Sequence, residues 1–181
     1  MTPARAAARP RSEAELVGLA ARFAEGRGYR SYVDPDGSSY FDLVVRRGDE
    51  VGLVEAKLGR ARPLLRQALR RRAWGDWVAV VLPSRRLAEP VVRSTADRRA
   101  APVGVWALDG GAIVELRPAD RFPAQDGADP FAPVRAHFRH VLDAVDAGAT
   151  PAGIPWDDVL GEVRRASGGR RFAEWRLDEL E

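Results

Sequence analysis

An uninterrupted apolar run, residues 77–82, constrains the fold of this chain most strongly. A short apolar run that ends at Pro83 is typical of a β-strand buried on both faces. Helical patterns precede and follow it, so we expect an α/β domain with a central mixed sheet flanked by helices. The other expected strands are 29–33, 40–46, 51–58, 103–108 and 112–116, and the expected helices are 12–26, 63–72 and 87–99, with Pro90 in the first turn of the last.

Composition divides the chain further. Residues 1–11 are rich in Ala, Arg and Pro without an apolar signal core, so we expect a disordered lead. Residues 12–117 form the main domain, and the Pro- and Asp-rich segment 118–133 is expected to be a linker. The remainder, 134–181, indicates a helical C-terminal extension. Its helices are expected at 134–147, 156–165 and 170–180; the last two are spaced like a helix-turn-helix, which leaves DNA contact or packing against the domain or a second subunit open.

Several function classes are excluded by composition alone. The chain has no Cys, which excludes disulfides, zinc–thiolate sites and thiol catalysis. No segment approaches the roughly 18 apolar residues of a membrane span, so we expect a cytoplasmic protein without a membrane partner. The net charge of +3 is too small to argue strongly for nucleic acid. A homodimer is compatible with the sequence but nothing requires one.

The segment 40–58 carries the most informative polar residues. If Gly48 and Asp49 form a two-residue hairpin loop, facing residues have numbers that sum to 97, and Gly in first position suits a type II′ turn. Asp42 then lies opposite Glu55, with Cβ atoms about 5 Å apart. Lys57, the sole Lys among 29 basic residues, points to the same face. The opposite, core-forming face is expected to hold Phe41, Leu43, Val45, Val54, Ala56 and Leu58.

Two facing carboxylates repel each other, and a divalent cation would compensate. Mg²⁺ is commonly held by one or two carboxylates together with waters and substrate phosphate. Beside such an ion, Lys57 could orient or deprotonate an attacking water, or stabilise charge developing on phosphorus. The alternative is a solvated sheet edge at which Lys57 simply balances Asp42 and Glu55.

The order of these elements resembles the PD-(D/E)XK nuclease superfamily, which has the restriction-endonuclease-like fold. The shared features are a first helix with acids near its start, the Asp42 and Glu55-x-Lys57 hairpin, a helix that carries Gln67, and a buried strand. The resemblance covers about 12–116 and is nearest to small, poorly characterised bacterial phosphodiesterase-like members. Phe41 stands where the superfamily motif has Pro, which weakens the match.

The resemblance implies roles for individual residues. Asp42 and Glu55 would bind Mg²⁺ or Mn²⁺, helped by the backbone carbonyl of Ala56. Lys57 would be the catalytic lysine, and Gln67 would support the site or touch the phosphate backbone. A first-helix acid would complete the site; Glu13, nearer the apolar stripe of that helix, is preferred to Glu15.

Three arginines of the helix that follows, Arg62, Arg66 and Arg70, could grip phosphates flanking the cut site, although a solvated helix face is the plainer explanation. We interpret Trp74, Trp77 and Trp106 as packing residues, and His137 and His140 as surface or packing residues. The expected function is metal-dependent hydrolysis of phosphodiester bonds, with DNA as the substrate. The alternative is a non-catalytic DNA-binding or regulatory protein built on the same fold.

Overall fold

A computed structural model describes residues 10–33, 41–59, 61–96, 103–122 and 131–148. Within these ranges, one six-stranded sheet is formed in chain order by β1 (Arg30–Tyr32), β2 (Leu43–Arg47), β3 (Glu50–Ala56), β4 (Trp77–Leu82), β5 (Gly104–Asp109) and β6 (Ala112–Arg117). The helices are α1 (Glu13–Glu25), α2 (Ala61–Arg71), α3 (Arg85–Ala96) and α4 (Ala132–Asp146).

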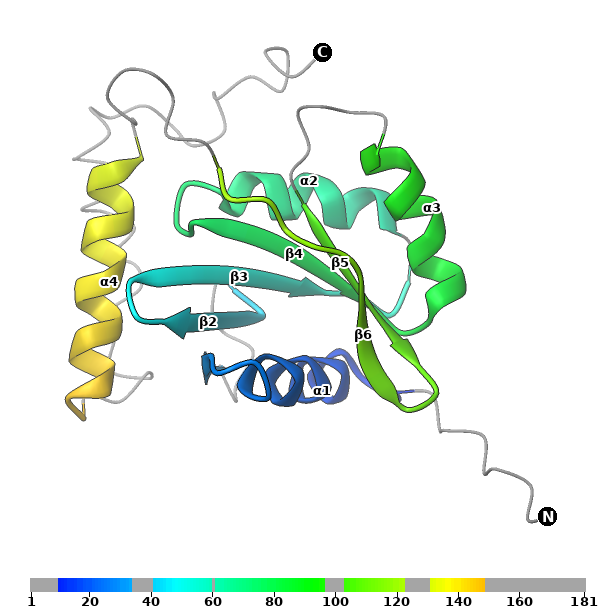
Figure 1. The fold of residues 1–181 in the computed structure, drawn as a ribbon, viewed down its shortest axis with the longest axis horizontal. Coiled ribbons are helices and arrows are strands. Elements are labelled where there is room, and N and C mark those ends of the chain that lie inside the picture. Colours follow the sequence, from blue (N-terminus) through cyan, green and yellow to red (C-terminus); the bar gives the residue numbers. More distant parts are fainter. Residues whose placement is uncertain (1–9, 34–40, 60, 97–102, 123–130, 149–181) are drawn as a thin grey trace.

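The sheet is mixed, which confirms the expected α/β class. Strands β3, β4 and β5 are parallel and are joined through α2 and α3, whereas β1, β2 and β6 run antiparallel to their neighbours. Helix α1 covers one face and α2 and α3 cover the other (Figure 1). Every residue of β4 is buried, as its apolar run predicts. No helix in the described ranges is long and apolar enough to cross a bilayer.

The β2–β3 hairpin has the predicted register. Leu43 pairs with Val54 and Arg47 with Glu50, so the loop is Gly48-Asp49 and partner numbers sum to 97. Gly48 has φ +60°, and no described residue other than glycine has a positive φ. A positive φ at the first loop position only is the signature of a type II′ turn.

Helix α1 begins where the sequence indicates, because the Ser12 hydroxyl accepts the backbone N–H of Glu15 at 3.1 Å. The start of α3 differs from the prediction. The helix begins at Arg85, so Pro90 is its sixth residue and does not lie in the first turn. Ser84 explains the earlier start, since its backbone carbonyl and hydroxyl both accept the N–H of Leu87.

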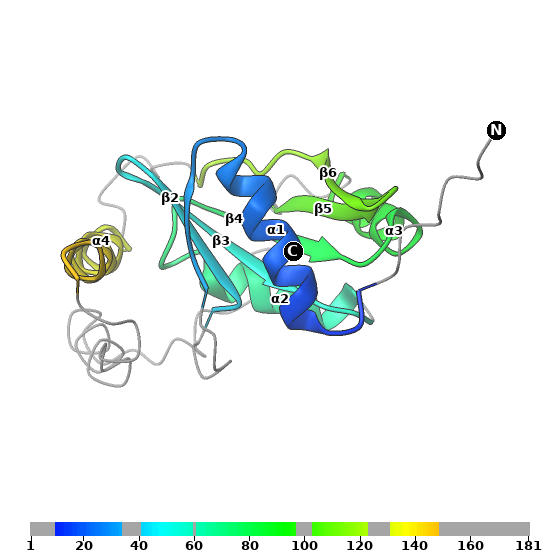
Figure 2. The same cartoon turned by 90° about the horizontal axis from the view of Figure 1, so that it is seen from below.

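Helix α4 packs beside the β2–β3 hairpin (Figure 2). Phe138 is fully buried, with its ring centroid 5.8 Å from that of Trp74 and 5.4 Å from that of Phe41. The start of the expected C-terminal extension therefore contributes to the main core. The expected helices 156–165 and 170–180 lie outside the described residues, as do 1–9 and, within the expected linker, 123–130.

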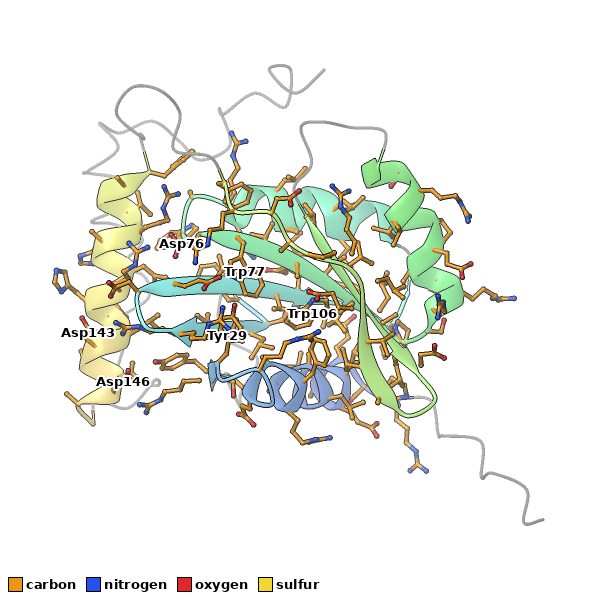
Figure 3. The ribbon with its side chains drawn as sticks, viewed as in Figure 1. Tyr29, Asp76, Trp77, Trp106, Asp143 and Asp146 are labelled. Atoms are coloured by element: carbon orange, nitrogen blue, oxygen red, sulfur yellow. The ribbon has the colours of Figure 1, made fainter. Side chains whose placement is uncertain are left out.

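Ion pairs and a hydrogen bond hold the half of α4 that follows Phe138 against the sheet. Arg139 donates to both oxygens of Asp76, at 2.7 and 3.0 Å, and Arg46 donates to Asp143 at 2.6 Å. Tyr32 donates to Asp146 at 2.9 Å. Figure 3 shows Asp143 and Asp146 on α4 and Asp76 at the neighbouring end of β4.

The face assigned to Phe41 was wrong. Leu43, Val45, Val54 and Ala56 pack with α1 as predicted, and Leu58 lies against them, but Phe41 packs on the opposite side with Trp74 and Phe138. The reason is that β2 begins only at Leu43, and the chain bends at Asp42. The alternation of faces along a strand does not extend past the strand end.

Candidate functional site

The polar residues singled out by sequence gather at the carboxyl end of β3. Asp42 immediately precedes β2, Glu55 is the penultimate residue of β3, and Lys57 follows the strand. The parallel strands β3, β4 and β5 all have their carboxyl ends on this side of the sheet. In open α/β sheets, ligands usually bind outside the carboxyl ends of the strands.

A backbone hydrogen bond fixes Asp42. The Lys57 N–H donates to the carbonyl of Val81 on β4 at 3.3 Å, so by alternation the N–H of Ala56 faces β2. There β2 has not yet begun, and the Asp42 carboxylate accepts the Ala56 N–H at 2.8 Å. Burial raises the pKa of Asp42, while the Ala56 N–H and the Lys57 ammonium oppose that rise.

Glu55 is 1% exposed and is held by α2. The Nε of Arg71 donates to its Oε1 at 3.1 Å. Its Oε2 is also buried and has no hydrogen-bond partner among the described residues. Burial raises the pKa of Glu55 to about 8; the Asp42 carboxylate adds to the rise and Lys57 opposes it. Asp42 and Glu55 are thus close enough for their charges to interact.

Lys57 takes a direction that the sequence does not predict. Its Nζ donates to Oε2 of Glu13 at 2.9 Å, and Glu13 belongs to α1, on the other side of the sheet from Arg71. The Nζ of Lys57 thus reaches the start of α1, while its charge still acts on the carboxylates of Asp42 and Glu55. The hydrogen bond to Glu13 raises the pKa of Lys57, and the charges of Asp42 and Glu55 raise it further.

The two first-helix acids have different environments. Glu13 contacts Lys57, whereas the Oε2 of Glu15 accepts the N–H of Arg11 at 2.7 Å at the start of α1. The structure therefore brings Glu13 to the cluster and leaves Glu15 at the helix end. On α2, Gln67 is half-buried one turn before Arg71. The side chains of Arg62, Arg66 and Arg70 lie outside the described part of the structure.

Arg71 is the residue that sequence reasoning missed. It lies in the run of arginines in which only Arg62, Arg66 and Arg70 were given a role, and it is 8% exposed. A signal was present: Leu64, Ala68 and Arg71 recur at helical spacing, and the first two are fully buried. This spacing puts Arg71 on the inward face of α2, where its guanidinium meets a buried carboxylate.

The remaining side chains pack as predicted. Trp74, Trp77 and Trp106 are all buried, and Figure 3 shows Trp106 between the sheet and α1. His140 is exposed, with Nδ1 3.9 Å from Asp143. Within the described residues, no three His, Asp or Glu side chains gather closely enough to hold a metal ion by themselves.

Comparisons with known proteins assign no family. No family model matches the chain, and no curated protein matches it. Among solved structures, the chain is similar to a protein of unknown function from Silicibacter pomeroyi, with a TM-score of 0.47 and 17% identity over 78% of this chain and 94% of that chain.

Proposed function

We propose that this protein is a metal-dependent nuclease that hydrolyses phosphodiester bonds in DNA, with a core related to the PD-(D/E)XK superfamily. One observation carries the proposal. The hairpin register brings the carboxylates of Asp42 and Glu55 together at the carboxyl edge of the sheet, and one buried oxygen of Glu55 has no hydrogen-bond partner among the described residues.

The chemistry of these groups fits Mg²⁺ or Mn²⁺. Burial disfavours the ionised forms of Asp42 and Glu55, and a neighbouring carboxylate adds to the effect, Glu13 for Asp42 and Asp42 for Glu55. A bound divalent cation offsets both effects. Two carboxylates are too few to enclose an ion, but Mg²⁺ is typically held by one or two carboxylates with waters and substrate phosphate. The Ala56 carbonyl is the further oxygen ligand that we propose here. Glu13 holds the Lys57 ammonium and does not gather with Asp42 and Glu55 into a three-acid group within the described residues.

When bound, the ion supplies Lewis acidity toward a phosphate oxygen and toward water. The chain's own groups provide the rest. Lys57 donates hydrogen bonds to the attacking water or to a phosphate oxygen, and Glu13 holds its ammonium in place. Gln67 supports the site from α2, and Arg62, Arg66 and Arg70 contact flanking phosphates.

One observation favours a second candidate, a non-catalytic DNA-binding or regulatory protein with the same fold. Both titratable groups of the Glu55-x-Lys57 motif already have a partner within the chain, Arg71 for Glu55 and Glu13 for Lys57. A buried ion pair of this kind is also consistent with a purely structural role. Binding of the ion distinguishes the two candidates.

Titration calorimetry with Mn²⁺, followed by incubation with plasmid, branched and single-stranded DNA in Mg²⁺, Mn²⁺ or EDTA, tests the proposal. We expect one Mn²⁺-dependent cleavage activity that Asp42→Asn and Lys57→Ala abolish while the near-ultraviolet circular dichroism of the Trp residues is unchanged. Arg27→Ala, at the opposite end of α1, is the matched control and should cut normally. A wild-type protein that binds DNA, does not bind Mn²⁺ and cleaves none of these DNA substrates would establish the second candidate.

A further inference from the structure

We propose that Arg71 is a positioning residue, which holds one oxygen of Glu55 so that the other faces the metal ion. The inference rests on the proposed function. Arg71 is the last residue of α2, and it reaches Glu55 with a single donor, Nε, at 3.1 Å from Oε1. Oε2 is left buried without a hydrogen-bond partner among the described residues.

The guanidinium of Arg71 is well placed to hold Glu55 in one orientation. Arg71 is 8% exposed, and its Cζ lies 5.4 Å from the ring centroid of Phe41, which itself packs against Trp74. Leu64 fixes the helix to the core on the same face. A planar guanidinium fixed by packing can orient a carboxylate more strictly than a flexible ammonium can.

The position of the unpartnered oxygen connects Arg71 to the proposed ion. Buried carboxylate oxygens normally have hydrogen-bond partners, so an exception calls for an explanation such as an ion. The Asp42 carboxylate accepts the backbone N–H of Ala56, the residue next to Glu55, at 2.8 Å. An ion that both carboxylates bind would give Oε2 its partner, while Arg71 keeps Oε1 engaged.

A different role for Arg71 makes the opposite prediction. If Arg71 only supplied a counter-charge to Glu55, it would compete with the ion, and its removal would tighten metal binding. If it orients Glu55, its removal weakens metal binding, because the freed carboxylate must be ordered by the ion. The sign of the change in Mn²⁺ affinity therefore separates the two roles.

The experiment is calorimetric titration of Mn²⁺ into the wild-type chain, Arg71→Met, Arg71→Lys and Arg72→Met at one fixed pH. Groups that orient metal ligands typically contribute about 10- to 100-fold to affinity, and we expect a loss of that order in Arg71→Met. Arg71→Lys keeps the charge and should recover only part of it. Arg72→Met is the matched control, since Arg72 stacks near Phe131 instead, and its affinity should equal that of wild type.

Cleavage of a DNA substrate gives a second readout. Because Arg71 is buried against Glu55, we expect Arg71→Met to leave the KM for DNA unchanged, to raise the Mn²⁺ concentration needed for half-maximal rate, and to regain most of its kcat at saturating Mn²⁺. Because Mn²⁺ also stabilises a folded chain that binds it, the melting curve of Arg71→Met in EDTA is the control: the variant should be fully folded at the assay temperature without the ion.

Three results would overturn the inference. Arg71→Met that binds Mn²⁺ as tightly as wild type, or more tightly, makes Arg71 a counter-charge. If Arg71→Met does not fold, the Mn²⁺ affinity of Arg71→Lys is the test. An affinity equal to that of wild type would again mean that Arg71 is only a counter-charge. A wild-type chain that binds no Mn²⁺ removes the proposed function and this inference together, whereas the first two results leave the function standing.

Discussion

The ammonium of Lys57 lies 2.9 Å from Oε2 of Glu13, and this contact joins two segments 44 residues apart in sequence. Glu13 is the first residue of α1, and Lys57 is the first residue after β3. Both side chains are partly exposed, at 34% for Lys57 and 44% for Glu13. The pair therefore contributes little to stability, about 0–1 kcal/mol, and its value lies in where it places the only ammonium side chain of the protein.

Separate substitutions of the two first-helix acids, Glu13 and Glu15, test this placement of Lys57. We expect Glu13→Gln to lower kcat for DNA cleavage about tenfold with little change in melting temperature, because Lys57 loses the carboxylate that holds it. Glu15→Ala should do the reverse. The Glu15 carboxylate accepts the Arg11 N–H, so loss of this acceptor should cost about 0.5–1 kcal/mol in the free energy of unfolding and leave kcat unchanged. Equal effects of the two variants on kcat would contradict the assignment.

The hairpin shows how much of this site local rules can predict. The Gly48-Asp49 loop sets the register from a turn preference alone, and that register places Asp42 beside Glu55. The Ser12 cap and the apolar run of β4 are likewise determined by neighbouring residues. These features need no knowledge of the rest of the fold, so the sequence predicts them.

Contacts made across the sheet could not be predicted in the same way. Arg71 finds Glu55 because α2 crosses back over β3. Its helical spacing from Leu64 and Ala68 indicates an inward position, but nothing in the neighbouring sequence identifies Glu55 as its partner. Phe41 was misplaced for a related reason. It lies just outside β2, where the two-residue alternation ends and tertiary packing decides the direction of the side chain.

Gly52 offers a test of the packing beneath the hairpin. It pairs with Trp77 in the neighbouring strand, and a Cβ added to Gly52 would lie 2.1 Å from Cζ2 of that ring. We expect Gly52→Ala to lower the free energy of unfolding by about 1–3 kcal/mol through overpacking. Gly18→Ala is the control. Its nearest atom would be Arg22 Nη1 at 3.9 Å, and an Ala within a helix should raise stability by about 0.5–1 kcal/mol.

Urea denaturation followed by Trp fluorescence measures both glycine variants. A Gly52→Ala protein as stable as wild type would show that the Trp77 ring can move aside without loss. It would also mean that the contact between Gly52 and Trp77 does not fix the spacing of β3 and β4.

The place of α4 in the core is tested by Phe138. This side chain is fully buried between Trp74 and Phe41, so Phe138→Ala should cost about 3–5 kcal/mol. His140→Ala, two residues along on the exposed side of α4, should change stability by no more than about 0.5 kcal/mol. A single cooperative unfolding transition is expected in each case. A separate early transition in Phe138→Ala would instead make α4 an independent unit.

The final prediction concerns pH. Burial raises the pKa of Glu55 from 4.5 to about 8, although the Arg71 guanidinium 3.1 Å away favours the ionised form; between these values the folded chain binds more protons than the unfolded chain. By linkage, the free energy of unfolding then falls as pH rises, with a slope of at most about 1.4 kcal/mol per pH unit for this one group. Below pH 4.5 Glu55 is protonated in both the folded and the unfolded chain, so its contribution to the free energy of unfolding is fully present. Above pH 8 Glu55 is ionised in both states, and that contribution is lost.

Glu55→Gln removes this titration. In EDTA, its melting temperature should gain on that of wild type as pH rises from 5 to 9, whereas Glu89→Gln, on an exposed position of α3, should follow the wild-type curve. With Mn²⁺ at high pH, wild type should instead melt at a higher temperature than Glu55→Gln. An ion that binds only the folded chain stabilises it, and ligation by the Glu55 carboxylate displaces its proton. If the melting temperatures of wild type and Glu55→Gln changed with pH in parallel, Glu55 would be ionised beside Arg71 across this range. Any loss of wild-type stability at high pH would then be assigned to Asp42.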